Sequence, residues 1–76
     1  DEKPIDEELF HKLKLWRKSK AIKENIKPYI IFSDSSLISI VNRLPKSIEE
    51  LLQVRGVGEK KVEKYGDEIL KLLSNE

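Results

Sequence analysis

The residues of this chain that are best suited to chemistry are its cations, which gather in one segment. Residues 11–29 carry seven lysines and arginines against one acid, Glu24, and so have a net charge of +6. Lysine and arginine neutralise nucleic-acid phosphates, and an exposed aromatic ring stacks on unpaired bases. We therefore predict a nucleic-acid-binding track made of Arg17, Lys20, Lys23, Lys27 and Tyr29. The open alternative is a solvated helix face, with Tyr29 packed beneath it and its hydroxyl alone in water.

A second group of cations follows the triplet "GVG" at residues 56–58. Glycine permits a positive φ and the close approach of another backbone. Amides in such a turn, next to a helix N-terminus, can point at a phosphate oxygen. We predict a secondary nucleic-acid-binding site made of Gly56, Gly58, Lys60, Lys61 and Lys64. Glu59 and Glu63 lie among these lysines and oppose phosphate binding, so a tight helix junction without a ligand is the alternative.

The sequence offers little to enzyme chemistry. It has one histidine, His11, and no cysteine, which excludes disulfides, thiolate metal sites and a cysteine nucleophile. The acids are scattered, so no carboxylate pair and no nucleophile with its base can be assembled. No G-x-x-x-x-G-K-[ST] loop is present to hold a nucleotide. We expect no catalytic residue, no metal and no cofactor in this domain, and we expect His11 at the surface.

Length and composition favour one small, surface-rich helical domain. The chain has 76 residues, of which 38% are hydrophobic and 38% are charged. No apolar run approaches the roughly 20 residues that a membrane-spanning helix needs. The first ten residues, "DEKPIDEELF", are acidic, unlike a secretory signal, and they lack an initiator methionine. We therefore expect a piece of a larger protein that makes no membrane contact.

A helix from Asp6 to about Asn25 is needed to position the first group of cations, and the apolar pattern predicts one. The spacings of four, four and three place one set of apolar residues on a single helical face: Ile5, Leu9, Leu13 and Trp16. We predict that Trp16 belongs to the core. Lys20 interrupts this face. Either the helix has left the core by that point, or the lysine stem lies on apolar surface with its ammonium in water.

Proline and capping residues divide the next part of the chain. Pro28 ends the first helix, and "PYIIF" is expected to be a buried connector because no strand is available to pair with it. Ser33 or Asp34 caps a second helix, which Pro45 closes. Its core candidates are Leu37, Ile38, Ile40, Val41 and Leu44.

A helix-hairpin-helix pattern follows. Ser47 and Glu50 have capping-box spacing and begin a third helix, "IEELLQV". After the glycine turn we predict a fourth helix over about 59–64 and a fifth over about 67–73. The apolar residues that should lock the hairpin together are Leu51, Leu52, Val54, Val57 and Val62.

The chain resembles a known family at this point. In order and spacing, "LKLWRKSKA", "IKPYIIFSDSSL", "LP" and "SIEELLQVRGVGEKKVEKYGDEIL" are similar to the HRDC (helicase-and-RNase-D C-terminal) domain. The resemblance covers about residues 9–73. It implies a single HRDC domain with a core over about residues 6–73. Its expected fold is an all-α, compact five-helix bundle that contains a helix-hairpin-helix-like junction.

The resemblance also implies a function. It is greatest to the HRDC domain of a bacterial RecQ-type ATP-dependent DNA helicase, with a UvrD-like helicase or RNase D as alternatives. Such a domain is expected to be a monomer that binds single-stranded or branched DNA weakly and with little sequence preference. It would target the helicase to its substrate in DNA repair and recombination, in the bacterial cytoplasm at the nucleoid. ATP and Mg²⁺ would bind elsewhere in the parent. The alternative is a protein-interaction module that docks on the parent helicase core or on another partner.

Overall fold

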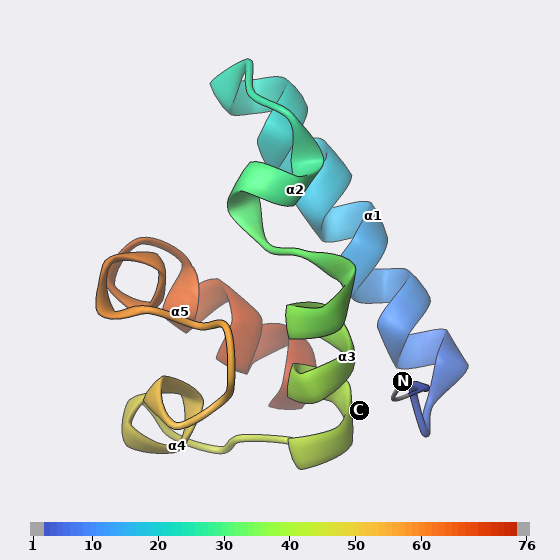
Figure 1. Ribbon diagram of the computed structural model, residues 1–76, viewed down its shortest axis with the longest axis vertical. Helices are drawn as coiled ribbons and strands as arrows, with labels where there is room; N and C mark the ends of the chain where they lie inside the picture. The colour runs from blue at the N-terminus through green and yellow to red at the C-terminus, as the bar shows by residue number, and fades with distance from the viewer. Residues whose placement is uncertain (1–2, 75–76) are drawn as a thin grey trace.

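The regular structure of the protein is helical throughout the part that the computed structural model describes, residues 3–74 (Figure 1). The helices are α1 (Glu7–Glu24), α2 (Pro28–Ile31), α3 (Asp34–Arg43), α4 (Ile48–Leu52) and α5 (Glu59–Ser74). Residues 3–74 contain no strand. The all-α, five-helix prediction is therefore confirmed, although two regions form different helices from those expected.

Helix α1 begins and ends close to the predicted residues. The carboxylate of Asp6 caps its N-terminus by accepting a hydrogen bond of 3.1 Å from the backbone N–H of Leu9. Glu7 and Glu8 occupy the first turn, where the helix dipole favours negative charge. Asn25 ends the helix in a left-handed conformation with a φ of 57°, which asparagine tolerates well. Helices α2, α3 and α5 pack against α1.

The prediction that "PYIIF" is a buried connector is wrong, because residues 28–31 form the short helix α2. Pro28 occupies its first turn, where a missing backbone N–H breaks no helical hydrogen bond. The N–H of Phe32 donates to the carbonyl of Pro28 at 3.4 Å, so the segment needs no partner strand. Burial is confined to the end of the segment, where Ile31 and Phe32 are 1% and 0% exposed.

The two helices expected after the glycine turn are one continuous helix, α5. Gly66 lies inside it and is buried. A Cβ atom at Gly66 would approach Ile48 Cδ1 to 3.0 Å and Val62 Cγ1 to 3.1 Å. Gly66 is therefore a position where α4 packs closely on α5, and it does not break the helix.

The core contains most of the apolar positions that the sequence predicted. Those that are buried include Leu9, Leu13, Leu37, Ile40, Val41, Leu51, Val54, Val57 and Val62. Trp16 is partly buried and packs on this core, with its ring centroid 5.6 Å from that of Tyr65 and 6.3 Å from that of Phe32. The prediction for Trp16 therefore holds in part, since the side chain is only partly buried.

Four predicted core residues lie further out. Ile5 is 82% exposed because α1 begins only at Glu7, so Ile5 does not continue the helical face. Leu44 and Leu52, at the ends of α3 and α4, are also exposed. Ile38 is half-buried. Ile38, Leu44 and Leu52 follow the predicted spacing, but no neighbouring helix covers them fully.

Candidate nucleic-acid interface

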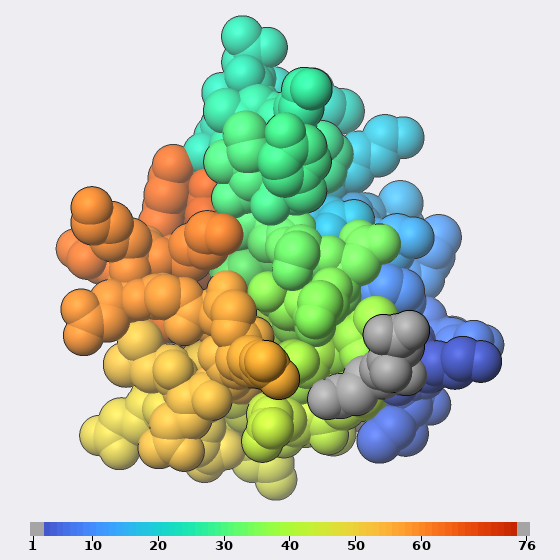
Figure 2. Space-filling view, in the orientation of Figure 1, coloured from blue at the N-terminus to red at the C-terminus, as the bar shows by residue number. Residues whose placement is uncertain are grey.

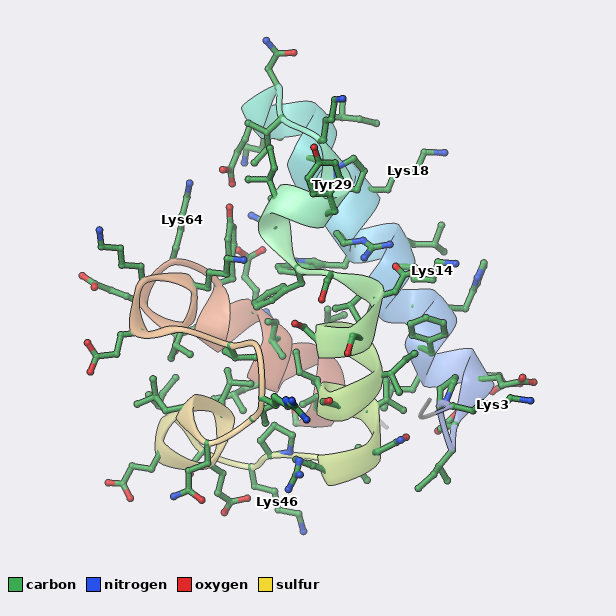
Figure 3. All side chains as sticks on the ribbon, in the orientation of Figure 1. Lys3, Lys14, Lys18, Tyr29, Lys46 and Lys64 are labelled. Carbon is green, nitrogen blue, oxygen red and sulfur yellow. The ribbon has the colours of Figure 1, made fainter. Side chains whose placement is uncertain are left out.

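Tyr29 stands on the solvent side of α2 (Figure 3). Ile31, at the end of α2, is buried. The two residues before it lie toward solvent, and Tyr29 is 63% and Ile30 48% exposed. The alternative in which Tyr29 packs beneath the first helix is therefore wrong. In the space-filling view, α2 and the C-terminal end of α1 form a knob at one end of the molecule (Figure 2). An aromatic ring on such a projection has a face available for stacking.

Arg17 does not belong to a surface track, which corrects the prediction for this residue. It is only 8% exposed, and its Nη1 donates to the backbone carbonyl of Phe32 at 2.9 Å. Its Nη2 lies 2.8 Å from Asp34 Oδ1. Because Phe32 and Asp34 flank the start of α3, the guanidinium joins α1 to the α2–α3 connection. The stem of Arg17 fills a core position, and both terminal nitrogens of its guanidinium already have partners within the fold.

Lys20 is largely occupied by an ion pair between α1 and α5. Its Nζ lies 2.8 Å from Glu68 Oε2, and its side chain is 20% exposed. The ammonium of Lys20 therefore pairs with Glu68, whereas the alternative drawn from the sequence had left it in water. The hydrogen bond from Lys20, together with one from Trp16 Nε1, holds the pKa of Glu68 below its usual range. Lys23 and Lys27, the other lysines of the predicted track, are exposed.

Lys14 and Lys18 are cations that the sequence argument left out of the track. Together with His11, Leu15, Arg17 and Pro28 they line a shallow depression of about 280 Å³ between α1 and the start of α2. Figure 3 shows both lysines extending from the same side of α1, beside the helix that carries Tyr29. Periodicity could have identified them: Leu9, Leu13 and Arg17 recur every four residues on the buried face, and Lys14 and Lys18, one position later, lie about 100° further around the helix. His11 is exposed, as expected.

The exposed cations and the ring form one surface. We use the term α2 surface for Lys14, Lys18, Lys27, Tyr29 and Ile30. All five residues are exposed. Lys14 Nζ lies 5.3 Å from the centroid of the Phe10 ring, so this lysine also covers an aromatic face. The α2 surface combines positive charge with an uncovered aromatic ring.

In the glycine turn between α4 and α5, Gly56 packs closely against Ser36 of α3. Gly56 has a φ of 86°, and a Cβ atom there would lie 2.3 Å from Ser36 Oγ. The Ser36 hydroxyl donates to the Gly56 carbonyl at 3.4 Å, which ties α3 to the turn. Gly58 is different: a Cβ atom there would meet nothing within 4 Å. The predicted helix junction is present, and Gly56 is explained by packing without a ligand.

Two of the three lysines after the glycine turn, Lys61 and Lys64, contact groups within the fold. Lys64 Nζ lies 2.7 Å from Glu24 Oε1, and the Tyr65 hydroxyl donates to the same carboxylate at 2.9 Å. Lys61 Nζ lies 5.5 Å from the centroid of the Phe32 ring. Lys60 is exposed, and the acids Glu59 and Glu63 beside these lysines are exposed as well. The charge of this region is therefore mixed.

The contacts of Glu24 change the ionisation of its partners. The hydrogen bond from Lys64, and after it the one from Tyr65, lowers the pKa of Glu24. The same contact with Glu24 raises the pKa of Lys64. Burial raises the pKa of the Tyr65 hydroxyl, and the hydrogen bond to Glu24 raises it further. Each shift favours the hydrogen-bonded, paired form of the cluster at neutral pH.

The described residues also show two absences. Within residues 3–74, no helix is long and apolar enough to cross a membrane. The same residues contain no group of three or more His, Cys, Asp or Glu side chains placed to hold a metal ion.

Comparisons with known proteins connect this geometry to a family. Residues 6–73 match the HRDC domain. The ATP-dependent DNA helicase UvrD2 of Mycobacterium tuberculosis is 41% identical over 69 residues, which are 91% of this chain and 10% of that protein. The ATP-dependent DNA helicase RecQ of Haemophilus influenzae is 43% identical over 68 residues, 90% of this chain and 11% of that protein. The chain thus spans about a tenth of the length of these relatives.

A solved structure shows the same fold. The chain resembles HRDC domain 3 of D. radiodurans RecQ with a TM-score of 0.85 and 28% sequence identity. The match covers 88% of each of the two chains. The whole arrangement of the helices is therefore shared with that domain.

Proposed function

The chain belongs to the HRDC domain family, and from this premise we propose that it is an auxiliary nucleic-acid-binding domain of an ATP-dependent DNA helicase of the RecQ or UvrD type. The similarity to helicases of both types supports this parent. The domain would hold single-stranded or branched DNA weakly, with little sequence preference, and would direct the helicase to that substrate in repair and recombination. ATP and Mg²⁺ would bind in the helicase core, and the complex would act at the bacterial nucleoid.

The observation that carries the proposal is the exposed ring of Tyr29 among exposed lysines on the α2 surface. Every nucleobase has a π-face, so stacking on a tyrosine is tolerant of sequence. Lys14, Lys18 and Lys27 would neutralise phosphates on either side of the stacked base. Duplex ends and junctions expose few unpaired bases, whereas single strands expose many. The α2 surface is therefore expected to prefer single-stranded segments.

Titration of the domain with a short labelled oligothymidylate at low salt tests this proposal. We expect weak binding that falls as salt rises, and chemical-shift changes centred on Tyr29, Lys14 and Lys18. Tyr29→Ala should cost about 1–3 kcal/mol of binding free energy. Tyr29→Phe keeps the ring and is the matched control. Equal affinities of Tyr29→Ala and Tyr29→Phe would contradict stacking, and an absence of shifts at millimolar protein would contradict DNA binding altogether.

A second function is favoured by two exposed aliphatic residues on the outer face of α1. Leu15 is 52% and Ile22 72% exposed, and both lie among lysines. The corresponding proposal is that this face docks on an acidic surface of the parent helicase core. A double variant, Leu15→Ser with Ile22→Ser, should then weaken association with the separately expressed core while oligothymidylate binding is retained. Retention of both activities would contradict docking through this face.

A further inference from the structure

An apolar groove lies far from the α2 surface. It is formed by Leu44, Pro45 and Lys46 of the α3–α4 connection together with Leu70, Leu73 and Ser74 of α5, and its volume is about 450 Å³. Figure 3 shows Lys46 near one end of the molecule and Tyr29 near the other. We call this feature the α3–α5 groove. A ligand bound there would leave the α2 surface open.

One wall of the α3–α5 groove has an unusual backbone. Leu44 ends α3 in the left-handed conformation, with a φ of 47° and a ψ of 60°. Helices commonly place glycine or asparagine at such a position, as α1 does with Asn25. Leucine is strained in this conformation, and burial offsets little of the strain because Leu44 is 48% exposed. The strained backbone thus holds an aliphatic side chain at the wall of the groove, where solvent reaches it.

The charged group in the α3–α5 groove is a cation. Lys46 is exposed and lines the groove, and none of the described residues that line it is acidic. Lys71, also exposed, follows Leu70 on α5. The nearby acid Glu50 accepts a hydrogen bond of 3.1 Å from the backbone N–H of Lys46 and lines a separate depression with Arg43. The groove therefore complements an apolar group that has a carboxylate beside it.

We propose that the α3–α5 groove binds a short acidic and apolar peptide segment of a partner protein. An aliphatic side chain of the segment packs between Leu44 and the leucines of α5, and a neighbouring carboxylate pairs with Lys46. The groove volume lies within the range of ligand-binding pockets. DNA is not the expected ligand, because the groove offers one lysine for phosphates and no aromatic ring for stacking on bases. The proposal does not depend on DNA binding at the α2 surface.

The test uses the peptide acetyl-Asp-Leu-Asp-Glu-Leu-Leu-amide, titrated into the isotope-labelled domain. We expect shifts at the amides of residues 44–46 and 70–74, with an affinity that falls as salt rises. Leu44→Asn should weaken binding by about tenfold, because it removes the apolar wall while asparagine tolerates the left-handed backbone. Leu52→Asn makes a comparable change at an exposed residue of α4 outside the groove and should bind the peptide normally.

A charge reversal supplies the second variant. Lys46→Glu should lose the acidic peptide and gain acetyl-Lys-Leu-Lys-Lys-Leu-Leu-amide, because the rim charge sets the choice of partner. Shifts centred on the lysines of α1, or equal affinities of the original protein and Leu44→Asn, would overturn the proposal. So would the absence of shifts at millimolar peptide. Both groove variants should bind oligothymidylate normally. Peptide titration therefore tests the groove proposal, and oligothymidylate titration tests DNA binding independently.

Discussion

The α2 surface and the region after the glycine turn both combine lysines with a tyrosine, yet their side chains have different partners. After the turn, Lys64 and the Tyr65 hydroxyl converge on the Glu24 carboxylate, and Lys61 lies over the Phe32 ring. On the α2 surface, Tyr29 is 63% exposed. Lys64, although its side chain is 61% exposed, joins α5 to α1 through the Glu24 carboxylate, whereas the Tyr29 ring projects into solvent. Residue type and local charge therefore do not distinguish a structural cation from one available to a ligand.

The same contrast exists between two adjacent residues of α1, and it predicts the largest effect on stability. Arg17→Met keeps the stem and removes the guanidinium, which leaves the buried carbonyl of Phe32 without its donor. We expect a loss of about 2–3 kcal/mol of unfolding free energy. Lys18→Met, at an exposed position, should change it by less than about 0.5 kcal/mol. Urea denaturation measures both values. Similar stabilities of the two variants would remove the distinction between structural and free cations.

The two glycines of the turn offer a second contrast. Gly56→Ala places a Cβ atom against Ser36 Oγ at a φ of 86°, so we expect a loss of about 1–3 kcal/mol in thermal or urea unfolding. Gly58→Ser meets no neighbour and introduces a favourable helix-capping residue, so its stability should be unchanged or slightly higher. If Gly58→Ser instead reduced oligothymidylate affinity, the turn would bind phosphate after all.

Lysine variants test the contrast in DNA binding. Lys14→Ala with Lys18→Ala should reduce oligothymidylate affinity by roughly threefold to tenfold. It should also reduce the salt dependence by about 0.7 per lysine in log K against log salt concentration. Lys61→Ala with Lys64→Ala removes equal charge from the other region and should have a smaller effect, because Lys64 is paired with Glu24 and the exposed acids Glu59 and Glu63 lie beside both lysines. Fluorescence anisotropy at several salt concentrations measures both. Equal effects would indicate binding through net charge alone.

The smallest predicted effect is on the pH dependence of stability. The pKa of Glu24 is lowered in the folded state, so its stabilising contribution is present above the usual glutamate pKa and is lost as pH falls through the lowered value. Glu24→Gln should therefore flatten the acid limb of a stability–pH curve. The raised pKa values of Lys64 and Tyr65 act on the alkaline side, where stability is lost as pH rises through them. An equal loss of unfolding free energy with falling pH in Glu24→Gln and in the original protein would contradict this account.

Local sequence signals predicted the helices whose ends depend on short-range chemistry. Asp6, Ser33 and Ser47 each cap a helix, as their side chains can accept a hydrogen bond from an amide three residues later. Helix α2 was missed because a four-residue helix has too few turns to show periodicity. The prediction that the helix is interrupted near Gly66 was wrong. Glycine has a low helix propensity, but here its missing side chain makes room for α4 to pack on α5.

The candidate site was predicted less completely than the fold. The sequence identified Tyr29 and the basic character of α1, but it placed Arg17 outside and omitted Lys14 and Lys18. Strict use of the helical period around Leu9 and Leu13 would have placed Arg17 on the buried face and Lys14 and Lys18 outside it. The ion pairs of Lys20 with Glu68 and of Lys64 with Glu24 could not be foreseen, because each joins residues far apart in the chain.

The sequence by itself determined the helical class, most of the core and the family, because periodicity, caps and the glycine turn are properties of short segments. The tertiary structure decided which cations remain available to a ligand. Arg17 and Lys18 are neighbours with the same charge, and the α2–α3 connection covers one and not the other. Burial depends on which element packs against a helix face, and charge patterns along the chain do not contain that information.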